Sequence, residues 1–330
     1  MKNFTKGVLV MALTLVILPL ITVLLQTVFP KPIPQNEIAA STRLVSQLET
    51  VKILDFLSDT PYEISLDEYL TQAVLATAEP DYHQEVLKAQ AVLMRTYILN
   101  RRLCELESPT LELFGCDIST ESGKYSKLLS DTEGEILYGE AYTAFKEKVV
   151  SAVTSTKGEY LFYNGEPCVV AFCYACGGAT ESAEEVLGQS VDYLKSVWCP
   201  DTFLQEITYT QDEVFARISL NCPATLTGEP KNWVRLQSVV LPSGFVKEVA
   251  LGDGYLASGS QLASWLNLPS AKFSVKYSSD TKKFTFTVLG SGHLVGLCHK
   301  GSCIMAQKGS TYQEIIRYYM PSVEIVKNSA

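Results

Sequence analysis

The sequence predicts an α+β fold: a mixed helical and β core with a strand-rich inserted subdomain, preceded by one N-terminal transmembrane helix. Three observations predict it. Gly7 to Pro30 is an apolar run without a charged residue, Ser65 to Arg102 contains two consecutive helix patterns, and Thr208 to Thr287 alternates as strands do. The core is expected to use both ends of the chain, with the insertion at about 205–288.

The apolar run is long enough to cross a bilayer. At about 1.5 Å of rise per residue it spans a hydrocarbon core of roughly 30 Å. No small-residue cleavage site follows Phe29 closely, so an uncleaved anchor is a better interpretation than a secretory signal. Lys2 and Lys6 precede the run, which places the short tail in the cytoplasm and the rest of the chain outside. The expected segments are 1–30 (tail and anchor), 31–59 (tether) and 60–325 (the working domain).

Charge and cysteine content narrow the function classes. The net charge is −9 and no basic block occurs, which excludes a nucleic-acid partner. All nine cysteines follow the anchor, where disulfides are the first expectation and an odd thiol is left over. Cys173 and Cys176 have C-x-x-C spacing, which by itself fits zinc binding, redox chemistry or structural pairing.

The first helix pattern leads to a glutamate. Ser65 and Glu68 form an S-x-x-E capping box, which starts a helix. That helix should end near Ala78, because Glu79 precedes Pro80 and a residue before proline avoids the helical region. A Glu-Pro pair by itself is more typical of a solvated turn.

The stretch after Pro80 predicts a second helix. Asp81 and Gln84 repeat the capping pattern, and the helix should end near Arg101 and Arg102. Glu79 then lies at the joint between two helices, held by rigid elements. Further elements are expected as helices at 261–266 and 310–320 and as strands at 149–174, 273–277 and 284–287.

Three blocks of the chain, in order, resemble the stage II sporulation protein D family. The opening block contains Leu66-Asp67-Glu68-Tyr69-Leu70, Ala78-Glu79-Pro80, Glu85 to Val92 and Arg95-Thr96-Tyr97. The middle block contains Ala171-Phe172, Cys176 to Ser182 and Tyr193 to Val197. The closing block contains Gly292 to Gly296, Ser310 to Ile316 and Tyr318 to Pro321.

This resemblance implies a peptidoglycan lytic transglycosylase of sporulation. Such an enzyme cleaves MurNAc-GlcNAc glycan strands, preferably peptide-stripped, and leaves 1,6-anhydroMurNAc ends. The glutamate of the family's A-E-M-P motif maps onto Glu79, the expected catalytic acid/base. A single carboxyl group suffices, because the muramic acid 6-hydroxyl is a nucleophile within the substrate itself.

The resemblance also implies a location and partners. The chain would be a single-pass protein of the cell membrane, with its C-terminal domain outside the cytoplasm on the mother-cell side of the engulfment space. Its partners would be peptidoglycan glycan strands, a stage II sporulation amidase (protein P) and a membrane scaffold (protein M).

Five further positions are candidates for binding substrate. Arg95 matches the family pattern and could bind sugar substituents or the lactyl carboxylate, or could form a helix-face salt bridge. Tyr97 and Tyr125 could stack on sugar rings or belong to the core. Cys173 stands where the family has a histidine, and His293 either lines the cleft or is a turn residue.

The chain departs from the family at several cysteines and around Glu79. The methionine of the A-E-M-P motif is missing and the link to the second helix is shorter. In the family's zinc motif only Cys116 remains, since Glu121 and Ser122 replace histidine and cysteine; no zinc is expected there, and no cofactor. Cys176–Cys199 is the expected disulfide, with Cys298 and Cys303 in others.

Two rival functions remain. Relatives called amidase enhancers suggest a non-catalytic member that binds glycan and activates a cell-wall amidase. A thiol oxidoreductase built on Cys173 and Cys176 would need a thioredoxin-like βαβ context, which the sequence lacks.

Overall fold

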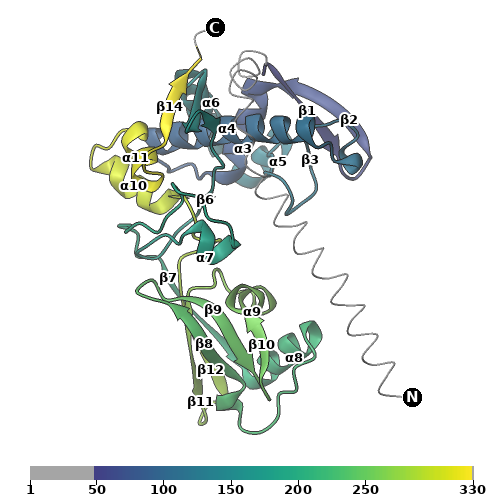
Figure 1. The fold of residues 1–330 in the computed structure, drawn as a ribbon, viewed down its shortest axis with the longest axis vertical. Coiled ribbons are helices and arrows are strands. Elements are labelled where there is room, and N and C mark those ends of the chain that lie inside the picture. The colour runs from purple at the N-terminus through teal and green to yellow at the C-terminus, as the bar shows by residue number, and fades with distance from the viewer. Residues whose placement is uncertain (1–47, 329–330) are drawn as a thin grey trace. The chain divides into compact units, whose positions relative to one another are not determined.

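The computed structural model describes residues 48–328, which form two compact units (Figure 1). Unit 1 comprises the described residues up to Val170 together with the chain from Val323 onward, and unit 2 is Ala171–Ser322. Each unit contains both helices and strands, so the predicted α+β class is confirmed. The expected strand-rich insertion at about 205–288 lies within unit 2.

Unit 1 is a group of helices with two small sheets. Its elements are β1 (Thr50–Asp55), β2 (Thr60–Ser65), α3 (Leu66–Thr77), α4 (Gln84–Glu107), η2 (Leu111–Leu113), β3 (Ile118–Ser119), α5 (Asp131–Tyr138), α6 (Ala141–Ser155), β4 (Glu159–Tyr163), β5 (Glu166–Pro167) and β14 (Glu324–Lys327). The sheets have the orders β2-β1-β3 and β14-β4-β5. Helices α3, α4 and α6 pack against one another. Strand β14 pairs with β4, so the last described residues complete a sheet of this unit.

The two helices around Glu79 form as predicted, with corrections at their ends. The Ser65 side chain accepts the Glu68 amide and α3 ends before Ala78, as expected. The predicted start of the second helix at Asp81 was wrong. His83 caps α4, because its Nδ1 atom accepts a hydrogen bond from the Glu85 amide. Asp81 instead lies in the turn. Helix α4 also continues to Glu107, past the predicted end at the arginines.

The prediction of strands at 149–174 was partly wrong, since α6 occupies Ala141–Ser155. Its buried residues include Tyr142, Phe145, Val149 and Ala152, which recur at the three- and four-residue spacing of a helix face. Strands begin only at β4, and β6 (Phe172–Cys173) follows.

The strand-rich part of unit 2 consists of two three-stranded sheets around one apolar core. Its elements are β7 (Leu204–Thr210), α8 (Gln211–Asn221), η3 (Pro230–Asn232), β8 (Val234–Val240), β9 (Phe245–Leu251), β10 (Tyr255–Ser258), α9 (Gly259–Leu266), β11 (Phe273–Ser278) and β12 (Lys283–Leu289). The sheets run β10-β9-β8 and β11-β12-β7. Strands β11 and β12 and helix α9 confirm three predictions. Helix α8 was not predicted, although Thr210 and Glu213 form a complete capping box at its start.

The rest of unit 2 contains short elements joined by loops: α7 (Ala183–Leu187), β13 (Leu297–Cys298), α10 (His299–Gln307) and α11 (Tyr312–Tyr319). Helix α11 confirms the helix predicted at 310–320. Strands β6 and β13 pair in parallel, with Cys173 opposite Cys298. This short ladder brings together two segments that lie far apart in the sequence.

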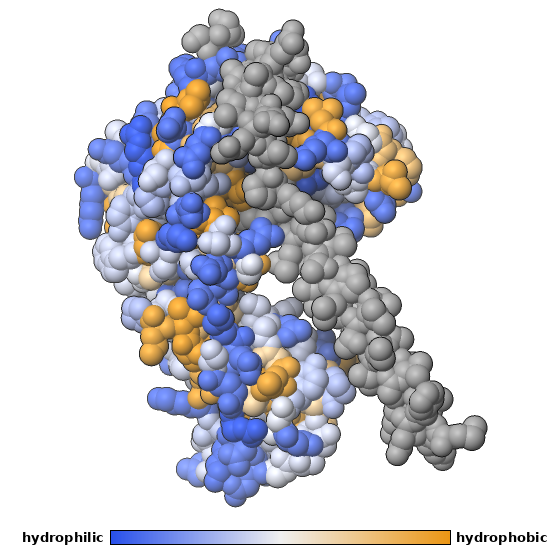
Figure 2. All heavy atoms as spheres, viewed as in Figure 1, coloured by the Kyte–Doolittle hydropathy of each residue, from blue (hydrophilic) through white to orange (hydrophobic). Residues whose placement is uncertain are grey.

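The predicted anchor, Gly7 to Pro30, lies outside the described residues. Within residues 48–328, no helix has both the length and the apolar character that crossing a membrane requires. Hydrophilic side chains cover much of the face shown in Figure 2, and apolar side chains gather there in separate groups.

Candidate functional site

Glu79 lies in the link between α3 and α4, which we call the Glu79 joint (residues 78–83). Its side chain is partly exposed, whereas the adjacent Ala78 is buried. The Glu79 carbonyl accepts the Tyr82 amide at 3.0 Å, which closes a tight turn around Pro80. The carboxyl group therefore extends from a short, ordered link and keeps a side open to solvent.

Helix α6 holds the Glu79 joint in place. Lys148 donates from Nζ to the Pro80 carbonyl at 3.3 Å and also to the Tyr82 carbonyl. Gln84 Nε2 in turn donates to the Lys148 carbonyl at 3.2 Å. These bonds fix the backbone on the C-terminal side of Glu79, so its position does not depend on the link alone.

Tyr138, at the end of α5, is a neighbour of Glu79 that the sequence did not reveal. Burial raises the pKa of Tyr138, and the negative charge of Glu79 raises it further. The Tyr138 ring packs edge-to-face against Phe145 at 5.3 Å between centroids, which orients it. A neutral tyrosine hydroxyl is a hydrogen-bond donor, so this side chain suits a carboxylate neighbour.

Arg95 lies in the core of unit 1, with 1% of its surface exposed. Its guanidinium donates to the carbonyls of Val153, at 3.1 Å, and Glu159, at 3.3 Å. Burial lowers the pKa of Arg95. The guanidinium has no open face for a sugar, and within residues 48–328 it forms no ion pair with a carboxylate. It ties α4 to the end of α6 and to β4, so we do not carry Arg95 into the proposed site.

Tyr97 and Tyr125 lie together at a distance from the Glu79 joint. The Tyr97 hydroxyl accepts the Ser126 amide at 3.3 Å, and Arg101 lies over the Tyr125 ring at 5.2 Å. Both tyrosines are partly exposed. Tyr97 is thirteen residues beyond the start of α4, about 20 Å along the helix. Sugar stacking at these rings would thus concern a different part of a glycan strand from the bond at Glu79.

The remnant of the family's zinc motif does not form a ligand set. Cys116 is buried, Glu121 pairs with Lys124 at 2.8 Å, and Ser122 is exposed. A lone thiol with a neutralised carboxylate does not fit a zinc ion. No step of the proposed chemistry therefore uses a metal here.

His293 is a residue of unit 2 in a tight turn. Gly292 and Leu294, on either side of it, have φ angles of 97° and 67°, and a left-handed leucine marks a sharply bent backbone. Its Nδ1 accepts the Val295 amide at 3.1 Å. His293 thus lies in a turn, and burial of its imidazole lowers its pKa to about 4; its role in binding substrate stays a prediction.

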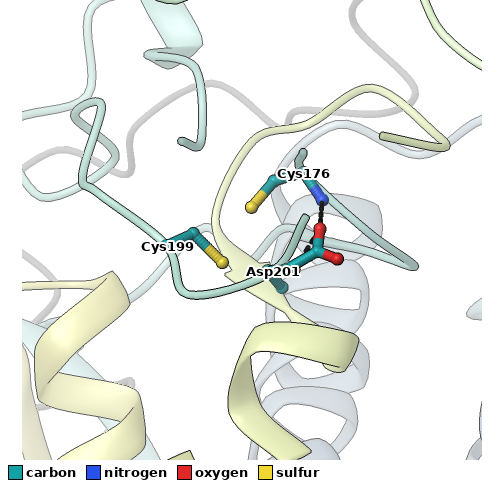
Figure 3. Close-up of side chains that lie close together, drawn as sticks. Cys176, Cys199 and Asp201 are labelled. Carbon is teal, nitrogen blue, oxygen red and sulfur yellow. Dashed lines mark hydrogen bonds between the residues drawn. The ribbon is translucent and has the colours of Figure 1, made fainter. Parts of the chain in front are cut away.

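A second group of side chains, the cysteine cluster, consists of Cys173, Cys176, Cys199 and Cys298 with Asp201. The ligand atoms of Cys176, Cys199, Cys298 and Asp201 all lie within 4.8 Å of one another. The Cys173 thiol forms a hydrogen bond with the Cys298 sulfur. Figure 3 shows the Cys176 and Cys199 sulfur atoms pointing into the same space beside Asp201.

The cluster is closed to solvent. Cys176 and Cys298 are 0% exposed, Cys199 is 1%, Cys173 is 3% and Asp201 is 4%. Cys173 has almost no exposed surface, so we do not carry it into the proposed substrate-binding site. The pKa of Cys298 lies well below its usual range, since three other thiols donate to its sulfur. All four cysteines are free thiols in the structure, so the expected Cys176–Cys199 disulfide stays a prediction.

Comparison with known proteins shows what the chain is similar to. A family model described as "Stage II sporulation protein" matches residues 59–163, which include the Glu79 joint. Stage II sporulation protein D of Bacillus subtilis (strain 168) is 28% identical over 279 residues, covering 81% of this chain and 76% of that protein. Its counterpart in Bacillus amyloliquefaciens is 28% identical over 268 residues, covering 79% and 74%. The amidase enhancer of Bacillus subtilis (strain 168) is 24% identical over 298 residues, covering 73% and 38%.

The chain is thus similar to stage II sporulation protein D, and residues 59–163 match the model of that family. Its similarity to two named family members extends over most of both chains, well beyond the segment that the family model covers.

Proposed function

We propose that this protein acts on the cell wall during sporulation, as a membrane-anchored lytic transglycosylase that cleaves peptidoglycan glycan strands with Glu79 as its acid/base. The observation that carries this proposal is the position of Glu79. Its partly exposed carboxyl group lies on a short link between two helices, in the segment that matches the family model.

The proposed reaction uses one carboxyl group twice. Protonated Glu79 gives its proton to the glycosidic oxygen between MurNAc and GlcNAc as the bond from C1 to that oxygen breaks. The 6-hydroxyl oxygen of the same MurNAc residue bonds to C1, and its proton passes to the Glu79 carboxylate. Glu79 is thereby restored, no water is consumed, and the products are a 1,6-anhydroMurNAc end and a free GlcNAc hydroxyl.

Tyr138 supports the carboxylate form between the two proton transfers. Its phenol hydroxyl is a hydrogen-bond donor, and its pKa is raised by burial and by the charge of Glu79. We assign it a positioning role, because it acts through Glu79 and not on the sugar.

The proposed location and partners are supported by the resemblance to the family and by the N-terminal sequence. The charge-free run from Gly7 to Pro30 would anchor the chain in the cell membrane, with both described units outside the cytoplasm. Peptide-stripped strands as substrate imply an amidase that acts first, and a membrane scaffold would bring the two enzymes together.

A Glu79→Gln variant of the purified full-length chain tests the assignment. The amide keeps the size of the side chain but cannot supply a proton, so cleavage of peptide-stripped glycan should fall about 10²–10⁴-fold. Asp81→Asn is the matched control, because Asp81 is an exposed carboxylate of the same joint, and it should retain full activity. Equal cleavage by wild type and Glu79→Gln would remove Glu79 from the chemistry.

The amidase enhancer among the relatives favours a second candidate, a non-catalytic protein that binds glycan and stimulates a cell-wall amidase. The two functions give different results in one assay. An activator would increase peptide release by added amidase and leave glycan length unchanged, whereas a transglycosylase shortens strands without any amidase.

A further inference from the structure

The cysteine cluster draws on three segments of unit 2. Cys173 and Cys176 lie at and just beyond β6, Cys199 and Asp201 come from the loop before β7, and Cys298 caps the start of α10. Cys173 and Cys298 are directly opposite each other in the β6–β13 ladder. Four thiols thus meet in one buried place, and two of them come from a single C-x-x-C pair.

We infer that this cluster is a structural zinc site in which Cys173, Cys176, Cys199 and Cys298 are the four ligands. A zinc ion with four thiolates at about 2.3 Å has its sulfur atoms about 3.8 Å apart. The sulfur atoms of Cys176, Cys199 and Cys298 lie within 4.8 Å of one another, and Cys173 is paired opposite Cys298 in the β6–β13 ladder. The burial of all four residues matches structural zinc sites, which have no position open to water.

Asp201 supports the site from outside the ligand set. Its Oδ2 accepts the amides of Cys176 and Gly177 at 2.8 and 2.7 Å, and its Oδ1 accepts the Phe203 amide at 2.9 Å. These three bonds already use most of its acceptor capacity, which is why we assign the fourth position to Cys173. Asp201 fixes the backbone that presents Cys176.

The surroundings of the cluster suit thiolates. The Gly301 amide donates to Cys298 Sγ at 3.4 Å, at the positive end of α10. Lys272, itself 2% exposed, donates from Nζ to the Cys176 carbonyl at 3.3 Å. The Gly301 amide thus faces a cluster sulfur directly, whereas Lys272, which also lies 3.9 Å from Glu181 Oε1, fixes the backbone at Cys176.

Gly301 leaves the room that the cluster needs. A Cβ atom at this position would lie 2.3 Å from Cys199 Sγ and 2.3 Å from the Tyr319 hydroxyl oxygen. That hydroxyl is itself 3.2 Å from Cys199 Sγ.

The rival arrangement uses the same sulfur atoms in two disulfides, Cys176–Cys199 and Cys173–Cys298. A sulfur atom in a disulfide cannot bind zinc as a thiolate, so an experiment can distinguish the two arrangements. The zinc site is also distinct from the family motif at Cys116, where no metal is expected, and it does not depend on the proposed glycan cleavage.

Elemental analysis of the full-length chain, purified without chelators, is the first test. We expect one zinc ion per chain, and its loss in Cys173→Ser, Cys176→Ser, Cys199→Ser and Cys298→Ser. Cys222→Ser is the matched control, because Cys222 is buried in unit 2 but lies outside the cluster, and it should keep the ion. Cys116→Ser should keep it too. Loss of zinc in Asp201→Asn but not in Cys173→Ser would overturn the assignment of Cys173 as the fourth ligand.

A second test uses the wild-type protein and does not depend on how the variants fold. Replacement of zinc by cobalt should give the visible spectrum of tetrahedral cobalt–thiolate coordination, and a chelator should lower the unfolding temperature until zinc is returned. The proposal is overturned if the protein contains no metal and alkylation of the denatured, unreduced chain leaves these four cysteines unlabelled, as the disulfide arrangement requires.

Discussion

The Glu79 joint and the cysteine cluster place reactive side chains in opposite surroundings. Glu79 is partly exposed on a short link, whereas the four cysteines are almost fully buried where three segments converge. A carboxyl group that acts on a polymer must keep an open side. A group that holds a chain together works best when closed to water and to competing ligands. Burial therefore separates the candidate catalytic residue from the candidate structural site.

Arg95→Met tests whether Arg95 is a structural residue of unit 1, and it should have the largest effect on stability. Arg95→Met should lower the free energy of unfolding by about 3 kcal/mol, because two buried carbonyls lose their donor. Urea unfolding followed by circular dichroism measures it. Arg317→Met, at an exposed site, is the control and should stay within about 0.5 kcal/mol of wild type. Unchanged stability with lost cleavage would return Arg95 to substrate binding.

Gly301→Ala tests how closed the cysteine cluster is. The new methyl group would meet Cys199 and Tyr319, and overpacking of this kind should cost about 2 kcal/mol and reduce the zinc content. Gln307→Ala, on the exposed side of the same helix, should change neither quantity. A stable Gly301→Ala protein with full zinc content would show that the cluster is looser than the structure indicates.

Ser65→Ala tests the start of the helix that leads to Glu79. Loss of the bond to the Glu68 amide should cost about 1 kcal/mol of stability. Ser65→Thr keeps a hydroxyl cap and should recover most of it. The rate of glycan cleavage per folded molecule should be the same in both variants and in wild type. A lower rate in Ser65→Ala alone would show that the position of Glu79 depends on the start of α3 and not only on the bonds of Lys148.

Tyr97→Phe has the smallest effect, confined to alkaline pH. Burial raises the pKa of Tyr97 from 10.0 to about 12, so the folded state favours the neutral phenol. This contribution is complete below about pH 10 and is lost as the pH rises toward about 12. The variant lacks it, so its stability should fall less steeply than that of wild type over this range. Parallel curves would show that Tyr97 is solvated.

Residues close together in sequence made the Glu79 joint predictable. A cap at Ser65 and a proline after Glu79 mark the end of one helix, and both signals are local. The start of α4 was placed wrongly because Asp81 fits the capping pattern as a sequence, whereas the tight turn at Pro80 leaves His83 as the cap.

The cysteine cluster depends on long-range pairing, which no local pattern encodes. Cys173 and Cys176 suggested a pair, but the other partners are distant in sequence: Cys199 lies in the loop before β7, and Cys298 ends β13, which pairs with β6. Arg95 shows the same limit: a family-like arginine on a helix face is read as a binding residue until its burial is known.

Analysis of the reaction products decides whether Glu79 cleaves glycan strands as a lytic transglycosylase. Peptide-stripped peptidoglycan is digested with the full-length chain, with Glu79→Gln as the blank, and the new ends are identified by mass spectrometry. The proposed reaction predicts 1,6-anhydroMurNAc ends, which are lighter by one water than hydrolysed ends and absent from the Glu79→Gln digest. Reducing MurNAc ends, or anhydro ends formed equally by both proteins, would contradict it.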